Sequence, residues 1–125
     1  MESYDPLIPP DPAAWQALDE DLRIILVRKY HEQAGIEIPG MDLHATMHVV
    51  IEGQLADAGD SVIMANYARL MAGGLNRHEA IHAMAFEMTT TLHLAQKRPD
   101  ANFNFMARYH GGLKRLKPRD WRGTA

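Results

Sequence analysis

The chain has 125 residues, of which 46% are hydrophobic, as expected for one soluble globular domain. It contains no cysteine, which excludes disulfides and thiolate zinc sites and leaves histidine and carboxylates as metal ligands. No stretch approaches the roughly 18 apolar residues of a membrane span, and the acidic, proline-rich start is unlike a signal peptide. We therefore expect a cytoplasmic protein that does not enter a membrane.

The net charge of -3 is unevenly distributed. Residues 1–63 carry 12 acidic and 3 basic side chains, a balance of -9, and residues 64–125 carry 4 acidic and 10 basic side chains, a balance of +6. Two solvated surfaces are the simplest interpretation of this asymmetry. A dimer that sets acidic against basic regions and a basic segment that meets nucleic acid are the alternatives.

The first half of the chain predicts helices and connectors. No segment shows the period-two alternation of a strand. Asp11 followed by Pro12 is typical of an N-cap with proline at the first helical position, which starts a short helix. Asp19 is expected to cap a longer helix that Gly35 ends, and Asp42 to cap a third helix, which runs to about residue 58.

The second half continues in the same way. Asp60 is expected to cap a helix over 61–72, and Asn76 a helix over 77–98 that Pro99 stops. A weaker helical segment over 101–115 is expected to be interrupted at Gly111-Gly112. The sequence thus predicts an all-α fold, a small bundle of four to five helices. Its predicted parts are a flexible N-terminal arm over 1–11, a helical domain over 12–115 and a basic C-terminal tail over 116–125.

Two histidine pairs carry the main functional prediction. His44 and His48 lie in the first two turns of one helix, and His78 and His82 lie in the first two turns of another. Short connections place successive helices antiparallel, so these two helices should run parallel and bring both pairs to one end of the bundle. An i, i+4 pair stacks two imidazoles on one face, within reach of a common ion.

Glu52 continues the face of the first pair by one turn, so it is expected to join or support the site. The predicted ligands are His44, His48, His78, His82 and Glu52. Zinc is the expected divalent metal, with iron or nickel as alternatives, because imidazole-rich ligation suits these ions. A hydrogen-bonded histidine cluster without metal is the competing interpretation. His31, His93 and His110 have no placed partners and are expected to be structural or exposed.

Residues 78–82 also spell H-E-x-x-H, the motif of zinc peptidase helices. In such peptidases the glutamate is the general base for zinc-bound water. Here Glu79 is the third helical residue after Asn76, a spacing typical of a capping box. We therefore expect a helix cap and no proteolysis.

Four motifs together resemble a known family. They are W-x2-LD at Trp15, VRKYH over 27–31, HA-x2-HVV-x-E-x-Q over 44–54 and RL-x3-GL-x-RHEAIHA over 69–83. They resemble small bacterial helical domains catalogued as a domain of unknown function, some of which lie beside SEC-C zinc-binding modules. The resemblance covers roughly residues 13–90 and implies a metal site at the paired histidines. The chain departs from that pattern at Gly53, which is expected either to allow close helix approach or to weaken its helix.

Three hypotheses follow, of which the first is a metal-binding helical protein, either a hydrolase or a metal-handling factor. The second is a protein interaction module with a structural histidine cluster. The third is nucleic-acid binding through the basic segment over 108–122, with Tyr109 and Trp121 available for stacking. A homodimer is also expected, because so few helices leave apolar residues such as Ile25 and Phe86 uncovered.

Overall fold

The computed structural model describes residues 1–97 and 102–124, which form six α-helices followed by a short 3-10 helix. The helices are α1 (Pro12–Gln16), α2 (Glu20–Gln33), α3 (Met41–Asp57), α4 (Ser61–Ala72), α5 (Arg77–Lys97) and α6 (Phe105–Arg115), and the 3-10 helix is η1 (Pro118–Asp120). These described residues contain no strand, so the predicted all-α class is confirmed. None of the described helices is both long and apolar enough to cross a membrane.

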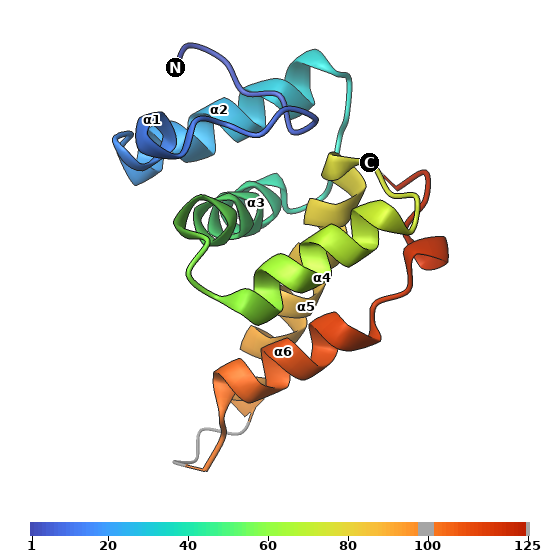
Figure 1. Ribbon diagram of the computed structural model, residues 1–125. Coiled ribbons are helices and arrows are strands. Elements are labelled where there is room, and N and C mark those ends of the chain that lie inside the picture. Colours follow the sequence, from blue (N-terminus) through green and yellow to red (C-terminus); the bar gives the residue numbers. More distant parts are fainter. Residues whose placement is uncertain (98–101, 125) are drawn as a thin grey trace.

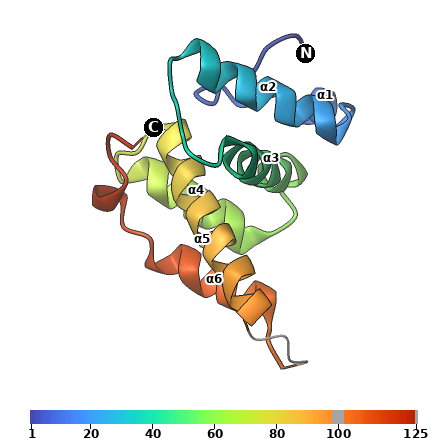
Figure 2. The same ribbon diagram turned by 180° about the vertical axis from the view of Figure 1, so that it is seen from behind.

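The helices stack in layers, with α3 in the middle (Figure 1). On one side of α3 lie α1 and α2, and on the other side lie α4, α5 and α6 (Figure 2). In both views α3 is seen close to end-on while α5 runs across it, so these two helices cross. One apolar core joins α3 to the layer of α1 and α2, and a second joins α3 to α4, α5 and α6. α3 therefore contributes to both cores.

Several predicted helix starts are confirmed by their caps. The Asp11 carboxylate accepts a hydrogen bond from the Ala14 N–H at 2.9 Å, and Pro12 is the first residue of α1. The Asp60 carboxylate accepts from the Val62 and Ile63 N–H groups at the start of α4. Such caps satisfy backbone donors that have no partner within the helix. The turn chemistry read from the sequence therefore fixes where these helices begin.

Two details of the predicted helices are wrong. α3 starts after Gly40, whose φ of 71° is in the left-handed region, and Asp42 pairs with Arg28 at 3.2 Å instead of capping the helix. Gly111 and Gly112 do not interrupt α6, which runs through both. A Cβ at Gly112 would lie 2.0 Å from a carboxylate oxygen of Glu87 on α5. The glycine permits α6 to pack closely against α5. The predicted helix end at residue 98 and helix start at 101 lie outside the described residues.

Both terminal segments pack against the helices, although the arm over 1–11 was expected to be flexible. In the arm over 1–11 the Tyr4 side chain is buried, and the Pro6 carbonyl accepts a hydrogen bond from Arg77 at 3.0 Å. In the tail over 116–125, Leu116 is buried and the Trp121 ring lies 5.3 Å from the Phe86 ring. Composition indicated solvent exposure, but each segment carries a few apolar side chains that the helices bury.

Candidate metal centre

Four histidines from three helices meet where the two cores join. His31 comes from α2, His48 from α3, and His78 and His82 from α5. Each offers one ring nitrogen, and these nitrogens all lie within 4.8 Å of one another. His31, His48 and His78 are at most 2% exposed. A set of buried imidazoles this close together could hold a metal ion.

The crossing of α3 and α5 explains how the predicted pairs converge. His78 and His82 are separated by one turn of α5, and their ring centroids lie 4.1 Å apart. The His48 ring lies 5.2 Å from the His78 ring and 5.5 Å from the His82 ring. Three of the four histidines predicted from the sequence therefore lie in the group.

His31 is the member that the sequence interpretation missed. It is fully buried on α2, and its ring lies 5.4 Å from His48 and 5.5 Å from His78. His31 was expected to be structural or exposed with no placed partner, whereas it is buried and lies within the group of four. A signal for its burial was present, because His31 is four residues after the buried Val27 and so shares its helix face. That spacing alone does not say which helix the face meets.

Hydrogen bonds hold three of these rings in one tautomer. Nδ1 of His31 donates to the Val27 carbonyl at 2.8 Å, and Nδ1 of His82 donates to the Thr124 carbonyl at 3.3 Å. Nδ1 of His48 lies 3.0 Å from the Tyr4 hydroxyl oxygen. That hydroxyl gives its own proton to the Glu52 carboxylate, so it accepts from His48. In each neutral ring the proton is on Nδ1, and the lone pair is on Nε2.

The Nε2 atoms of His48, His78 and His82 are buried and have no hydrogen-bond partner among the described residues. A buried polar nitrogen without a partner costs about 1–3 kcal/mol, and such atoms are few in folded proteins. Three of them in one small group form an arrangement suited to an ion that accepts several lone pairs. The hydrogen bonds on Nδ1 resemble those that orient histidine ligands in metal proteins.

The predicted ligand His44 lies at the edge of this group. Its Nε2 is 3.1 Å from Nε2 of His31, and its ring is 4.8 Å from the His82 ring. Because the proton of His31 is on Nδ1, the hydrogen bond between the two rings requires His44 to be the donor. His44 is only partly buried, and it also lines a surface pocket. It is therefore a fifth histidine that connects the buried group to the surface.

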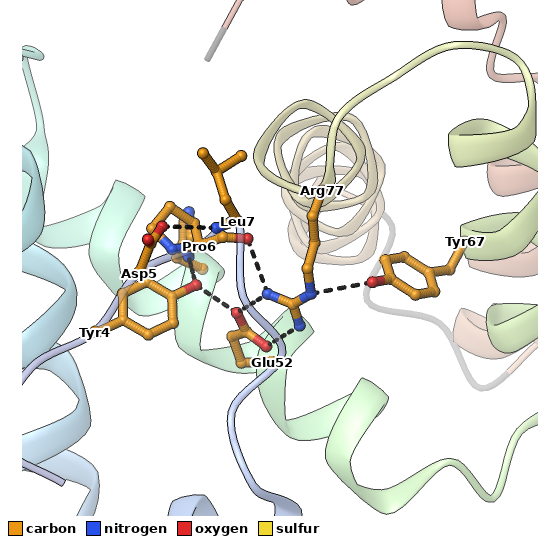
Figure 3. Close-up of polar contacts among 8 residues, drawn as sticks. Tyr4, Asp5, Pro6, Leu7, Glu52, Tyr67 and Arg77 are labelled. Carbon is orange, nitrogen blue, oxygen red and sulfur yellow. Dashed lines mark hydrogen bonds and ion pairs between the residues drawn. The ribbon is translucent and has the colours of Figure 1, made fainter.

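The predicted carboxylate Glu52 lies between the side chains of Tyr4 and Arg77 (Figure 3). Its two oxygens accept hydrogen bonds from Arg77 at 2.7 and 2.8 Å, and one of them also accepts from the Tyr4 hydroxyl. Glu52 and Arg77 are 1% and 4% exposed, so this is a buried ion pair. Among the described residues, Tyr4 links Glu52 to His48, so Glu52 is one hydrogen-bonded step from the histidine group.

Burial lowers the pKa of four of these five histidines, namely His44, His48, His78 and His82. Burial, followed by the neighbouring histidines, lowers the pKa of His78 to about 3 and that of His48 well below its usual value. Burial likewise lowers the pKa of His82 and of His44 to about 4. Burial also raises the pKa of Tyr4, with the nearby Glu52 adding to the effect, so its hydroxyl keeps its proton. Near pH 7 these histidines present lone pairs, the form that binds metals.

The capping interpretation of Glu79 is confirmed. Its carboxylate accepts from the Asn76 N–H at 2.9 Å, and the Asn76 side chain accepts from the Glu79 N–H at 2.8 Å. The other carboxylate oxygen accepts from the Gly123 N–H. The reciprocal capping box with Asn76 and the bond from Gly123 together engage both oxygens of Glu79. The glutamate is thereby committed to the backbone at the start of α5.

The remaining candidates lie apart from the site. His93 is exposed, and His110 contacts the Asp60 carboxylate at 2.7 Å. Tyr109, considered for stacking on nucleic-acid bases, is fully buried and donates a hydrogen bond to Gln54 at 2.7 Å. That part of the nucleic-acid hypothesis is wrong, because an enclosed ring offers no face to a base.

Comparisons with known proteins add no family or neighbour to this description. No protein-family model matches the chain, and neither the curated proteins nor the solved structures gave a match. The fold and site define an all-α protein with a buried cluster of histidines close enough to hold a metal ion. The functional inference therefore rests on the chemistry of that cluster.

Proposed function

We propose that this chain is a metal-binding protein in which His31, His48, His78 and His82 hold one divalent ion. The single observation that carries the proposal is the set of buried Nε2 atoms that lack partners. A purely structural histidine cluster is expected to satisfy its polar atoms through hydrogen bonds. Here Nδ1 of His48 and of His82 is paired, and Nε2 of His48, His78 and His82 is not. Nε2 of His31 accepts from His44, a hydrogen bond that an ion would replace.

Zinc is the proposed ion. Imidazole nitrogens suit zinc, which forms tetrahedral sites with nitrogen at about 2.0–2.1 Å, with iron and nickel as the next candidates. Two nitrogens in such a site lie roughly 3.4 Å apart. Nitrogens within 4.8 Å of one another reach that separation through small side-chain rotations. The neutral state of the rings also favours binding, because a cation does not have to displace a proton.

The partial positive charge of a helix N-terminus disfavours a cation beside it, and two of the ligands lie in the first turns of α5. The Glu52 carboxylate, which reaches His48 through Tyr4, supplies a negative charge one step from the ion. Arg77 also pairs with this carboxylate and offsets its charge. Glu52 therefore orients His48 through Tyr4 more than it neutralises the ion. Either a hydrolase or a metal-handling protein would use this centre.

Metal content after purification without a histidine tag tests the proposal. We expect one equivalent of zinc per chain, and we expect the His48→Ala/His82→Ala variant to lose it. His93→Ala is the matched control, since it removes an exposed histidine from the same helix. Circular dichroism would verify that each variant is folded. A double variant that keeps the metal content of the parent would show that the ion binds elsewhere.

Two single variants separate the ligand sets. If His31 is a ligand and His44 lies outside, His31→Ala should weaken zinc binding far more than His44→Ala. The opposite order would favour the set predicted from the sequence. Competition with a coloured zinc chelator measures both affinities under the same conditions.

A further inference from the structure

The segment after α6 gathers positive charge on one side of the molecule. Residues 114–122 contain five basic side chains and one acidic side chain. Leu116 is buried, and Arg122 donates a hydrogen bond to the Gly73 carbonyl at the end of α4 at 2.9 Å. Gly123 is bonded to the first turn of α5. The segment therefore runs from α6 past the end of α4 to the start of α5, and its charges are held in place (Figure 1).

Three of these cations line one open hollow. It has a volume of about 370 Å³, and Lys117, Arg119 and Arg122 form part of its wall. No acidic side chain is among the described residues that line it. Lys117 has no polar partner in the described part of the chain, and Arg119 has only an exposed contact of 3.9 Å with Asp120. Such a surface pair contributes about 0–1 kcal/mol, so both cations remain available to an anion such as phosphate.

Aromatic rings lie next to these cations. The Trp121 ring packs against the Phe86 ring with centroids 5.3 Å apart, and Phe86 is 53% exposed. Both rings line an apolar pocket of about 330 Å³. Because Trp121 directly precedes Arg122 in the chain, neighbouring residues line the apolar pocket and the basic hollow. This face therefore sets cations beside rings that a further flat, apolar group can stack on.

We infer that this face binds single-stranded nucleic acid. Its phosphates would contact Lys117, Arg119 and Arg122. An unpaired base would stack on Phe86 beside Trp121. A duplex offers the same phosphates but keeps its bases stacked inside, so the exposed ring favours a single strand. These contacts involve none of the proposed metal ligands, so the inference stands or falls independently of the metal centre.

Fluorescence anisotropy with a labelled oligothymidylate of about 15 nucleotides, a length within the site sizes of single-strand binding proteins, tests the inference. A duplex of the same length is the comparison. We expect the single strand to bind more tightly than the duplex at the same salt concentration, because only its bases can reach the rings. A duplex that binds as tightly as the single strand, or a chain that binds neither, would overturn the inference.

A pair of double variants locates the phosphate contacts. Lys117→Gln/Arg119→Gln should weaken binding and make the slope of log affinity against log salt concentration shallower by about 1.4, since each phosphate contact on a single strand contributes about 0.7. Arg28→Gln/Lys29→Gln is the matched control, because it makes the same two changes in exposed residues of α2. Equal slopes in the two variants would show that net charge, and not this hollow, attracts the strand.

A second pair of variants tests the ring. Phe86→Ala should weaken single-strand binding at least about fivefold, the factor that corresponds to about 1 kcal/mol of base stacking, and leave duplex binding unchanged. Ile25→Ala is the matched control, because Ile25 is 45% exposed on α2 and does not line the apolar pocket. Circular dichroism would verify that both variants are folded. Equal single-strand affinities in the two variants would overturn the inference.

Discussion

Tyr4→Phe tests how far the metal centre depends on its surroundings. The substitution removes one oxygen from a side chain that is 6% exposed and leaves the ring in place. Two hydrogen bonds disappear, one to the Glu52 carboxylate and one from His48 Nδ1. His48 then loses the partner that holds its tautomer and ring orientation. We expect zinc affinity to fall by about 10–100-fold, the usual effect of removing such a support.

The same change should lower stability by an amount that can be worked out. A bond to a charged group contributes about 1.5–3 kcal/mol and a neutral one about 0.5–1.5 kcal/mol, and with the neutral bond near 1 kcal/mol at most the loss is about 2–4 kcal/mol. A chain of 125 residues has an unfolding entropy of roughly 0.26 kcal/mol/K, so Tm should fall by about 8–15 °C. Thermal unfolding with and without zinc measures this fall.

Tyr30→Phe is the matched control for this experiment. The Tyr30 ring lies 5.5 Å from the His78 ring, but its hydroxyl has no hydrogen-bond partner among the described residues. Removing that hydroxyl should change zinc affinity less than about twofold, because it orients no ligand. If the two variants lose the same affinity, the Tyr4 hydroxyl does not support the site, and our reasoning about tautomers is refuted.

Three further predictions concern stability. Glu52→Ala leaves Arg77 buried without its carboxylate, so unfolding free energy measured in urea should fall by about 3–5 kcal/mol, and adding Arg77→Met should recover part of it. Gly53→Ala should raise it by about 0.5–1 kcal/mol, since a Cβ there meets open space. In chelator-treated protein, lowering pH from 7 to 5 should cost about 2 kcal/mol for His78, because its folded pKa of about 3 lies below the unfolded value near 6.5, and His48 should add to the loss in the same direction. The contribution of the neutral histidines to the unfolding free energy is complete above pH 6.5 and is lost at lower pH, because the unfolded chain takes up protons first. Urea titrations that give the same unfolding free energy at pH 7 and pH 5 would contradict the buried neutral state.

The helices could be predicted from local chemistry, because caps and breakers act within a few residues. Asp11, Asp60 and Asn76 each cap the helix that the sequence assigned to them. The start of the third helix was misassigned to Asp42, because both Asp and Gly are acceptable at a helix start and the choice depends on a left-handed backbone at Gly40. Local signals thus identify the elements more reliably than their first residue.

The site could be predicted only in part, because its members come from three helices. The pairs at 44/48 and 78/82 are visible as i, i+4 patterns, whereas His31 is a single histidine on α2. Its role follows from the packing of α2 over α3, which depends on the apolar contacts of Trp15, Leu26 and Val27. The position of Glu52 was equally hidden, since Arg77 competes for its carboxylate from another helix. Gly53 was also open to two interpretations, and the free space at its Cβ excludes close helix approach as the reason for a glycine there.

The motif at the start of α5 shows how an apparent peptidase signature is divided among structural tasks. Arg77 binds the buried carboxylate of Glu52, and Glu79 closes the capping box with Asn76 and binds the Gly123 N–H. Only His78 and His82 turn toward the histidine group. A glutamate whose two oxygens are held by backbone N–H groups is poorly placed to take a proton from metal-bound water. The centre is therefore better suited to binding an ion between helices than to peptide hydrolysis by the H-E-x-x-H mechanism.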